Sequence, residues 1–247
     1  MGLVIKQGIQ SAMVSYIGVA LGFVSFLVLF PLLLSKQEIG LVRTLEESTS
    51  LLATLALAGA PNLGIRYFPY FKNDENGNNG FLWILLFLPL AGILIVTVSL
   101  WLFDAPLRAL FNDPLMQRYW HYILPITIST MYFIVLEVYC RSNFAVVVPT
   151  FLRDAAKRIV TICAGMAVWY GVLDFAGMMQ WFAFSNIIIL FLLIAYMAKA
   201  DLWQLSSSPR LLLTPALRRE MLDFSGFILL GNLGGLLLGK LDTLMIA

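Results

Sequence analysis

The stretch QGIQSAMVSYIGVALGFVSFLVLFPLLLS, from Gln7 to Ser35, decides the fold class because it contains no charged residue. At a rise of about 1.5 Å per residue, a helix of this length exceeds the roughly 30 Å of a membrane's hydrocarbon core. The stretch is also too long for the apolar part of a signal peptide, and no small-residue cleavage site follows it. We therefore expect a first membrane-spanning helix at about Ile9–Leu34.

The composition of the whole chain agrees with this beginning. Of 247 residues, 60% are hydrophobic and 12% are charged, whereas ordinary soluble domains have about 45–50% and about 25%. A soluble, disordered or collagen-like protein is therefore excluded, and the apolar residues suffice for about seven spans. The net charge of +2 is too nearly balanced for a protein that holds a polyanion across its surface, so nucleic acid is not an expected partner.

Charged and polar segments divide the chain into seven expected spans. The second to the seventh are 39–60, 81–103, 119–140, 148–171, 175–198 and 224–247, with a polar loop at 62–80 and a short interfacial helix at 104–118. The predicted fold class is all-α, a polytopic transmembrane helix bundle. We expect a six-span bundle over 1–198, a basic cytoplasmic linker over 199–223, and a seventh span that is the first helix of a truncated second bundle.

The basic residues beside the expected spans predict an orientation. With the N-terminus in the cytoplasm, eleven Lys and Arg flank the spans inside and three, namely Lys36, Arg108 and Arg118, flank them outside. Cytoplasmic loops carry such an excess of basic residues. We expect a multi-pass protein of the bacterial inner membrane with a cytoplasmic N-terminus.

The residues needed for common enzyme chemistries are missing from the sequence. The only histidine, His121, lies beside Tyr119, Trp120 and Tyr122, as interfacial aromatic residues do. The two cysteines, Cys140 and Cys163, have no CxxC partner. We therefore expect no enzyme, no metal site and no cofactor.

Charged residues inside apolar spans are the candidates for function, because each is costly in hydrocarbon unless it faces a partner or water. Arg43, Glu46 and Glu47 are three and four residues apart, so they share nearly one face of a helix. One interpretation is that they line a water-filled cavity open to the exterior. The other is that they reach the nearby membrane interface.

Two further pairs of charges lie within or beside spans. Glu137 precedes Arg141 by four residues, which favours a structural ion pair on one helix. Lys240 and Asp242 are neighbours that point to different faces of the seventh span, so at least one should face protein or a cavity. The glycines of the first and seventh spans recur every four residues, which indicates close helix packing; they are Gly18, Gly22, Gly231, Gly235 and Gly239.

Several stretches together resemble a known family. They are Lys6-Gln7-Gly8, Gln37-Glu38-Ile39-Gly40, LAGAPNLGIRYFPY (57–70), VVPTFLRDAAKR (147–158) and DFSGFILLGNLGGLLLGKLDTLMIA (223–247). The chain resembles the N-terminal half of the multidrug/oligosaccharidyl-lipid/polysaccharide exporter superfamily, and within it the oligosaccharide-lipid flippases. The likeness covers most of the chain but consists of hydropathy and spacing more than of a fixed signature.

The resemblance implies a transporter made of two six-helix bundles that face each other across a cavity. It implies translocation of a polyprenyl-pyrophosphate-linked sugar, with Arg43 and Lys240 meeting the pyrophosphate and Glu46, Glu47 and Asp242 tuning the local charge. The expected partners are the lipid-linked oligosaccharide, membrane lipid, the missing C-terminal half and a coupling ion. The alternatives are a cation-coupled multidrug exporter and a non-catalytic membrane subunit of polysaccharide assembly. The first span lacks the acidic residue that cation-coupled exporters of the superfamily commonly carry.

Overall fold

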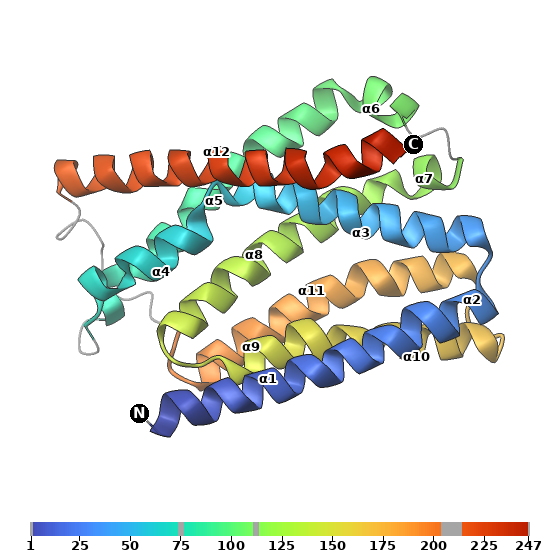
Figure 1. Ribbon diagram of the computed structural model, residues 1–247, viewed down its shortest axis with the longest axis horizontal. Helices are drawn as coiled ribbons and strands as arrows, with labels where there is room; N and C mark the ends of the chain where they lie inside the picture. Colours follow the sequence, from blue (N-terminus) through green and yellow to red (C-terminus); the bar gives the residue numbers. More distant parts are fainter. Residues whose placement is uncertain (1, 74–76, 111–113, 204–213, 247) are drawn as a thin grey trace.

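The computed structural model describes residues 2–73, 77–110, 114–203 and 214–246, and every regular element in these ranges is a helix (Figure 1). Within them, four segments are long and apolar enough to cross a membrane: 5–33, 78–102, 114–142 and 175–199. A fifth candidate is a pair of helices joined at a bend of 41°. The prediction of an all-α chain is confirmed, and the candidate spans are those of a multi-pass membrane protein.

The first span runs through α1 (Gly2–Phe23), a π-helical segment η1 (Val24–Leu29) and α2 (Phe30–Leu33). Helix α3 (Lys36–Leu57) begins directly after it at a capping box. The Ser35 hydroxyl accepts a hydrogen bond from the Glu38 amide, and the Glu38 carboxylate accepts one from the Ser35 amide. Two amides that the first turn leaves free are thereby paired, so the chain turns sharply here.

The second span differs from the sequence-based boundary. Helix α3 ends at Leu57, Ala58 and Gly59 adopt left-handed conformations, and a new helix α4 (Ala60–Phe71) follows at once. Pro61 lies between the expected span, 39–60, and the expected loop, 62–80, as a helix-ending proline would, but the structure places it in the first turn of α4, where its missing amide hydrogen costs nothing. The predicted loop at 62–80 is therefore helical as far as Phe71.

Two of the seven expected spans, 148–171 and 224–247, are not among the candidate membrane spans of the described residues. The remaining elements nevertheless lie close to the expected segments. They are η2 (Gly77–Gly80), α5 (Phe81–Leu102), α6 (Asp104–Leu110), α7 (Pro114–Tyr119), η3 (Trp120–Tyr122), α8 (Ile123–Ser142), α9 (Val147–Thr150), the π-helical segment η4 (Phe151–Ala156), α10 (Lys157–Trp169), α11 (Phe175–Lys199) and α12 (Pro215–Ile246). Helix α12 begins nine residues before the expected start of the seventh span. Its first turns lie in the predicted linker.

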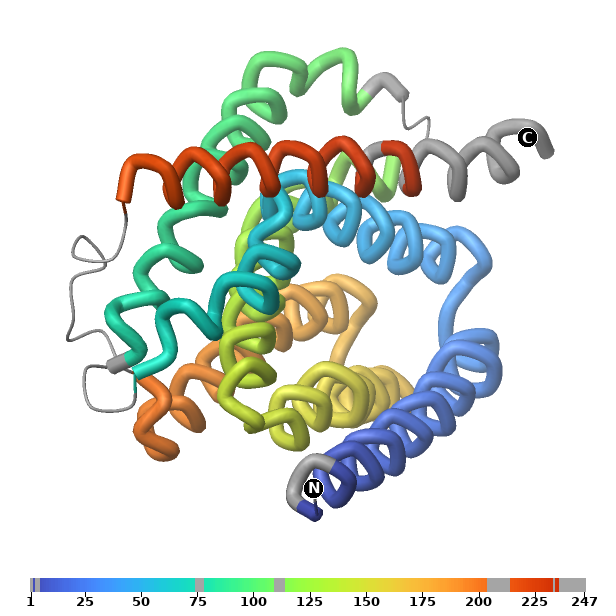
Figure 2. The backbone as a smooth tube through the Cα atoms, turned by 60° about the vertical axis from the view of Figure 1, so that its left-hand side comes forward, coloured from blue at the N-terminus to red at the C-terminus, as the bar shows by residue number. Residues whose placement is uncertain are grey.

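The chain passes back and forth along the long axis of the molecule (Figure 1). The N-terminus, the end of α4, the turn between α8 and α9 and the start of α12 all lie at one end, on the left in Figure 1. Helix α12 lies across α3 and α4, on the opposite side of the molecule from α1 (Figure 2).

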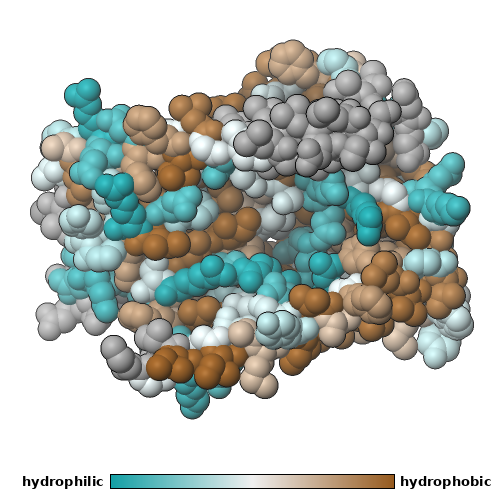
Figure 3. Space-filling view, in the orientation of Figure 1, coloured by the Kyte–Doolittle hydropathy of each residue, from teal (hydrophilic) through white to brown (hydrophobic). Residues whose placement is uncertain are grey.

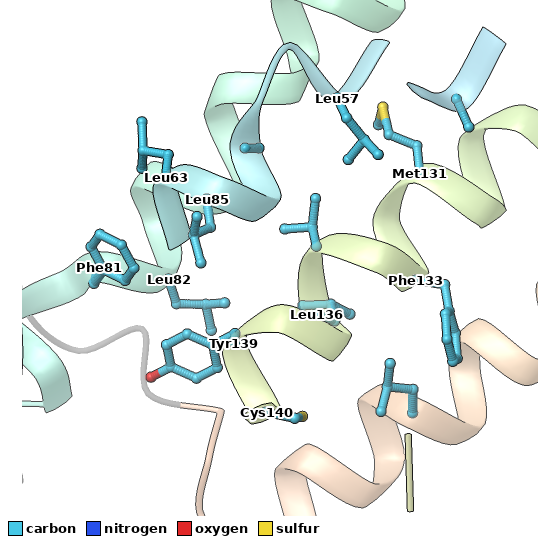
Figure 4. Close-up of a cluster of buried hydrophobic side chains, with 14 of the residues drawn as sticks. Leu57, Leu63, Phe81, Leu82, Leu85, Met131, Phe133, Leu136, Tyr139 and Cys140 are labelled. Atoms are coloured by element: carbon cyan, nitrogen blue, oxygen red, sulfur yellow. The ribbon is translucent and has the colours of Figure 1, made fainter. Parts of the chain in front are cut away.

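Helix α8 forms the centre of the packing. It contacts α3, α4, α5 and α11, and the buried side chains of these helices form one apolar cluster. Figure 4 shows part of it, with Met131, Leu136 and Tyr139 of α8 facing Leu57, Leu82 and Leu85. A second cluster joins α2, the first half of α3, η3 and the start of α11. Both clusters contain residues of α3, so this helix packs against other helices along most of its length.

Candidate functional site

A cavity of about 680 Å³ lies between the first span, α3 and the η4–α10 segment. Its apolar wall comes from the first span and consists of Val19, Phe23, Phe26 and Leu27, with Ser15, Gly18 and Gly22 beside them. Its charged wall comes from the two other elements and consists of Arg43, Glu46, Arg153, Asp154, Lys157 and Arg158. Hydrophilic side chains gather around a hollow near the middle of the face shown in Figure 3.

The cavity lies well inside the first candidate span. The residues that line it run from Ser15 to Leu27, whereas the span runs from Ile5 to Leu33. At 1.5 Å per residue, the lining is about 15 Å from one end of the span and about 9 Å from the other. Charged residues at such a depth need water or a partner.

Helix α3 contributes two of the three residues that the sequence singled out together. Arg43 and Glu46 both line the cavity, as their spacing of three residues on a helix allows. Glu47 is exposed and is not among the lining residues. Of the three residues expected on one cavity-lining face, the structure therefore places Arg43 and Glu46 at the cavity and Glu47 outside it.

The other charged residues were missed as site residues by the sequence analysis. Arg153, Asp154, Lys157 and Arg158 belong to the expected basic start of the fifth span, where the three basic residues count toward its orientation. They form two pairs four residues apart, which places them on one side of a helix. That spacing was the available signal, and the structure turns this side toward α1 and α3.

A close approach of two backbones brings α1 to this charged segment. A Cβ atom at Gly18 would lie 2.7 Å from the carbonyl oxygen of Asp154, so only glycine fits there. One turn earlier, the Ser15 hydroxyl donates a 2.7 Å hydrogen bond to the Asp154 carboxylate. The predicted packing role of the small residues in the first span therefore has a specific partner, the η4 segment.

A network of ion pairs links the helices around the cavity. Arg141 Nη2 lies 2.7 Å from Glu137 Oε1, so the structure contains the ion pair that the sequence indicated. Arg153 also pairs with Glu137, whose side chain is only 5% exposed, and with the neighbouring Asp154. Across the cavity, Lys157 Nζ lies 3.1 Å from Glu46 Oε1. The carboxylates Glu46, Asp154 and Glu137 are thus all paired with cations.

Two cations of the cavity have no carboxylate partner among the described residues. Arg43 forms no ion pair there, and Arg158 stacks over the ring of Phe26 at 5.0 Å but forms none either. With four cations and two carboxylates in its lining, the cavity carries a net positive charge. Two guanidinium groups with free donors can bind a phosphate or carboxylate in bidentate fashion.

Two predicted site residues remain without a described environment. Lys240 and Asp242 belong to α12, but their side chains lie outside those that the structure describes. On the same helix, Gly231 and Gly235 have no atom within 4 Å of the position of a Cβ atom. The described residues therefore place no helix against the side of α12 that carries these two glycines.

The arrangement combines an anion-binding wall with an apolar wall in one space. It suits a ligand that carries a phosphate-like head and an apolar portion. Comparisons with models of known protein families, with curated proteins and with solved structures give no match.

Proposed function

We propose that this chain forms the N-terminal part of a lipid-linked oligosaccharide flippase that moves a polyprenyl-pyrophosphate-linked sugar across a bacterial inner membrane. The observation that carries the proposal is the cavity at mid-depth of the first span, with the guanidinium groups of Arg43 and Arg158, which form no ion pair with any described residue. A pyrophosphate in mid-membrane needs such donors because the surrounding hydrocarbon offers none. The proposal is consistent with the resemblance to the exporter superfamily.

The two walls of the cavity match the two parts of this substrate. The head of the substrate is anionic and polar, and its tail is apolar. Phe23, Phe26 and Leu27 line the same cavity and belong to the least buried of the four candidate spans. A substrate can therefore keep its tail toward the lipid beside the first span while its head lies among the cations.

The proposed topology has six spans in a first bundle and a seventh span in α12, with the N-terminus in the cytoplasm. The end of the molecule that holds the N-terminus also holds the ends of α4, α8 and α11 and the start of α12 (Figure 1). These helix ends carry Lys72, Arg141, Lys199 and Arg218, whereas the start of α3 and the short helices α6 and α7 at the other end carry Lys36, Arg108 and Arg118. Arg153, Lys157 and Arg158 line the cavity and no longer count toward orientation. A single cysteine at Ser35 should react with an impermeant maleimide added outside cells, and one at Asn143 should not. The reverse pattern would overturn the topology.

A second helical bundle is the proposed partner of this one. Gly231 and Gly235 leave a flat, open face on α12, and small residues let helices approach closely in membranes. A second bundle packed there would stand beside Lys240 and Asp242. The proposal also includes the contact of Lys240 with the pyrophosphate, the tuning of local charge by Asp242, a coupling ion and a lipid-linked sugar as the substrate.

The alternative of a cation-coupled multidrug exporter is less well supported. Exported drugs of that kind are commonly cationic, and a net positive cavity repels them. The carboxylates Glu46 and Asp154, which could attract such a drug, are both paired with cations of the chain. The charge of the cavity thus favours an anionic substrate.

A binding experiment tests the proposed function. Farnesyl pyrophosphate, used as a short probe, should bind the purified protein in detergent, and farnesol should not. Arg43→Ala and Arg158→Ala should each weaken binding about tenfold, the effect expected for the loss of a charge-assisted hydrogen bond. Arg43→Lys should keep part of the affinity because the charge survives without the bidentate geometry.

Arg108 supplies the matched control, since it is a partly exposed arginine that does not line the cavity. Arg108→Ala should leave the affinity for farnesyl pyrophosphate unchanged. Equal binding of farnesol and farnesyl pyrophosphate, or equal losses in the Arg43 and Arg108 variants, would contradict the proposal.

A further inference from the structure

The ion pair between Glu46 and Lys157 joins two residues that both line the cavity and that come from helices distant in sequence. Arg153 finds one partner in its sequence neighbour Asp154 and the other in buried Glu137. Lys157 lies on α10, and its carboxylate partner lies on α3, 111 residues away in sequence. The backbones of α3 and α10 hardly touch each other, so this pair is a bridge across the cavity.

The pair is exchangeable on physical grounds. The side chains of Lys157 and Glu46 are 23% and 30% exposed, so water in the cavity reaches both. Ion pairs with access to water contribute little to stability, so their partners exchange readily. An anion that binds several cations at once can therefore displace the carboxylate from the ammonium group.

The positions of the neighbouring cations say which anion would do so. Arg43 lies three residues before Glu46 on α3, and Arg158 follows Lys157 on α10. All four side chains line the same cavity. A phosphate held by Arg43 and Arg158 lies between the same two helices as the Glu46–Lys157 bridge, and Lys157 is its natural third donor.

A second contact keeps Lys157 in place when the carboxylate leaves. Its ammonium nitrogen lies 5.6 Å from the centre of the Phe182 ring of α11. Cation–π contacts at this distance are attractive. The lysine therefore stays at the cavity after Glu46 has moved away.

From these contacts we infer that Glu46 is an internal competitor for the anionic group of the ligand: it holds Lys157 while the cavity is empty and yields it when a phosphate enters. The inference rests on the proposed function and deepens it, because it names a residue that sets the affinity for the substrate without touching it. A competitor of this kind prevents tight binding, and weak binding allows a transported head group to leave.

The test uses inorganic pyrophosphate as the probe and isothermal titration calorimetry of the purified chain in detergent. Glu46→Gln should bind pyrophosphate about threefold more tightly than wild type, which is the range of a partly exposed ion pair. Glu46→Asp should gain less affinity than Glu46→Gln, because the charge remains on a shorter side chain. A variant that only damaged the structure would lose affinity instead of gaining it.

Two further variants separate competition from a general change of charge. Glu47→Gln removes the same charge from the next residue, which does not line the cavity, and it should leave the affinity nearly unchanged. In a Lys157→Gln background, binding should be weaker and Glu46→Gln should have no further effect.

The outcomes distinguish the inference from the proposed function. If wild type binds pyrophosphate and Glu46→Gln binds it no more tightly, the competitor role is overturned and the proposed function stands. If the Glu46 and Glu47 variants gain equally, the effect is general electrostatics and the inference is again overturned. If neither wild type nor Glu46→Gln binds pyrophosphate, the proposed anionic substrate is wrong, and the inference falls with it.

Discussion

Helices α8 and α1 belong to two candidate membrane spans that differ in how far they are buried in the molecule. In the most apolar window of the span that contains α8, 67% of the residues are buried in the molecule, against 17% for the span that contains α1. Helix α8 packs against four long helices, whereas α1 packs mainly on the segment from α9 to α10. Both spans are apolar, but one forms the core and the other forms one wall of a cavity.

The difference shows that hydropathy alone does not tell what a span does. The central helix α8 tolerates Glu137 because Arg141 and Arg153 neutralise its carboxylate. The outer helix α1 carries no charge from Gln7 onward, yet its glycines and serines bring it against a charged segment. A span without charges can therefore line a charged site, because its neighbours supply the charges.

The largest loss of stability is expected at Gly92, in the buried part of the bundle. This residue of α5 packs directly on the backbone of α3 at Ala56, so a methyl group there collides with a carbonyl oxygen. Gly92→Ala should lower the free energy of unfolding in mixed micelles by about 3 kcal/mol, because overpacking forces two helices apart.

Gly8 of α1 is the control, since nothing lies within 4 Å of its Cβ position. Gly8→Ala should stabilise slightly or have no effect, as alanine favours helices over glycine. If both variants unfold like the wild type, the packing of α5 on α3 is looser than described.

Glu137 should give the next largest effect. Glu137→Gln removes the charge that Arg141 of α8 and Arg153 of η4 share, and it should cost about 2 kcal/mol of unfolding free energy, because two charge-assisted hydrogen bonds at a side chain only 5% exposed then become weaker ones to a neutral acceptor. Asp223→Asn, at an exposed carboxylate 4.0 Å from Arg219, should change little. Equal effects of the two changes would show that Glu137 is solvated.

A smaller loss of stability is expected at Ser15, where α1 contacts the charged segment beside the cavity. Ser15→Ala removes the hydrogen bond from α1 to the Asp154 carboxylate and should cost about 1 kcal/mol, the usual net value of one hydrogen bond. Ser50→Ala, at an exposed serine of α3, is the matched control and should leave unfolding unchanged. A loss at Ser15 as large as that at Glu137 would remove the contrast between the two sides.

Much of the fold could be predicted because long uncharged stretches indicate membrane-spanning helices by their length and composition alone. The limits of α5 and α11 lie within one residue of the predicted spans, 81–103 and 175–198. The join of α3 and α4 could not be predicted in the same way. Pro61 ends a helix in one context and begins one in another, and only the left-handed residues Ala58 and Gly59 before it decide which.

The site was predictable only in part. Arg43 and Glu46 stood out because charges are rare in apolar spans, and a spacing of three residues placed them on one face. Arg153, Lys157 and Arg158 did not stand out, since a basic start of a span has an ordinary explanation as an interface anchor. Their role depends on which helix packs beside them, and that is a tertiary contact with no local signal.

The smallest effect is expected where the chain repeats the Glu137–Arg141 geometry at its surface. Asp104 and Arg108 are also four residues apart, and their closest atoms are 2.8 Å apart, against 2.7 Å for Glu137 and Arg141. The Asp104 side chain is 43% exposed, whereas that of Glu137 is 5% exposed. Because water screens the exposed pair, a double-mutant cycle with Asp104→Asn and Arg108→Gln should give a coupling of about 0.3 kcal/mol that vanishes in high salt. The same cycle at Glu137 and Arg141 should give a larger coupling that salt reduces much less. Equal couplings with equal salt dependence would mean that burial in this bundle does not change the strength of an ion pair.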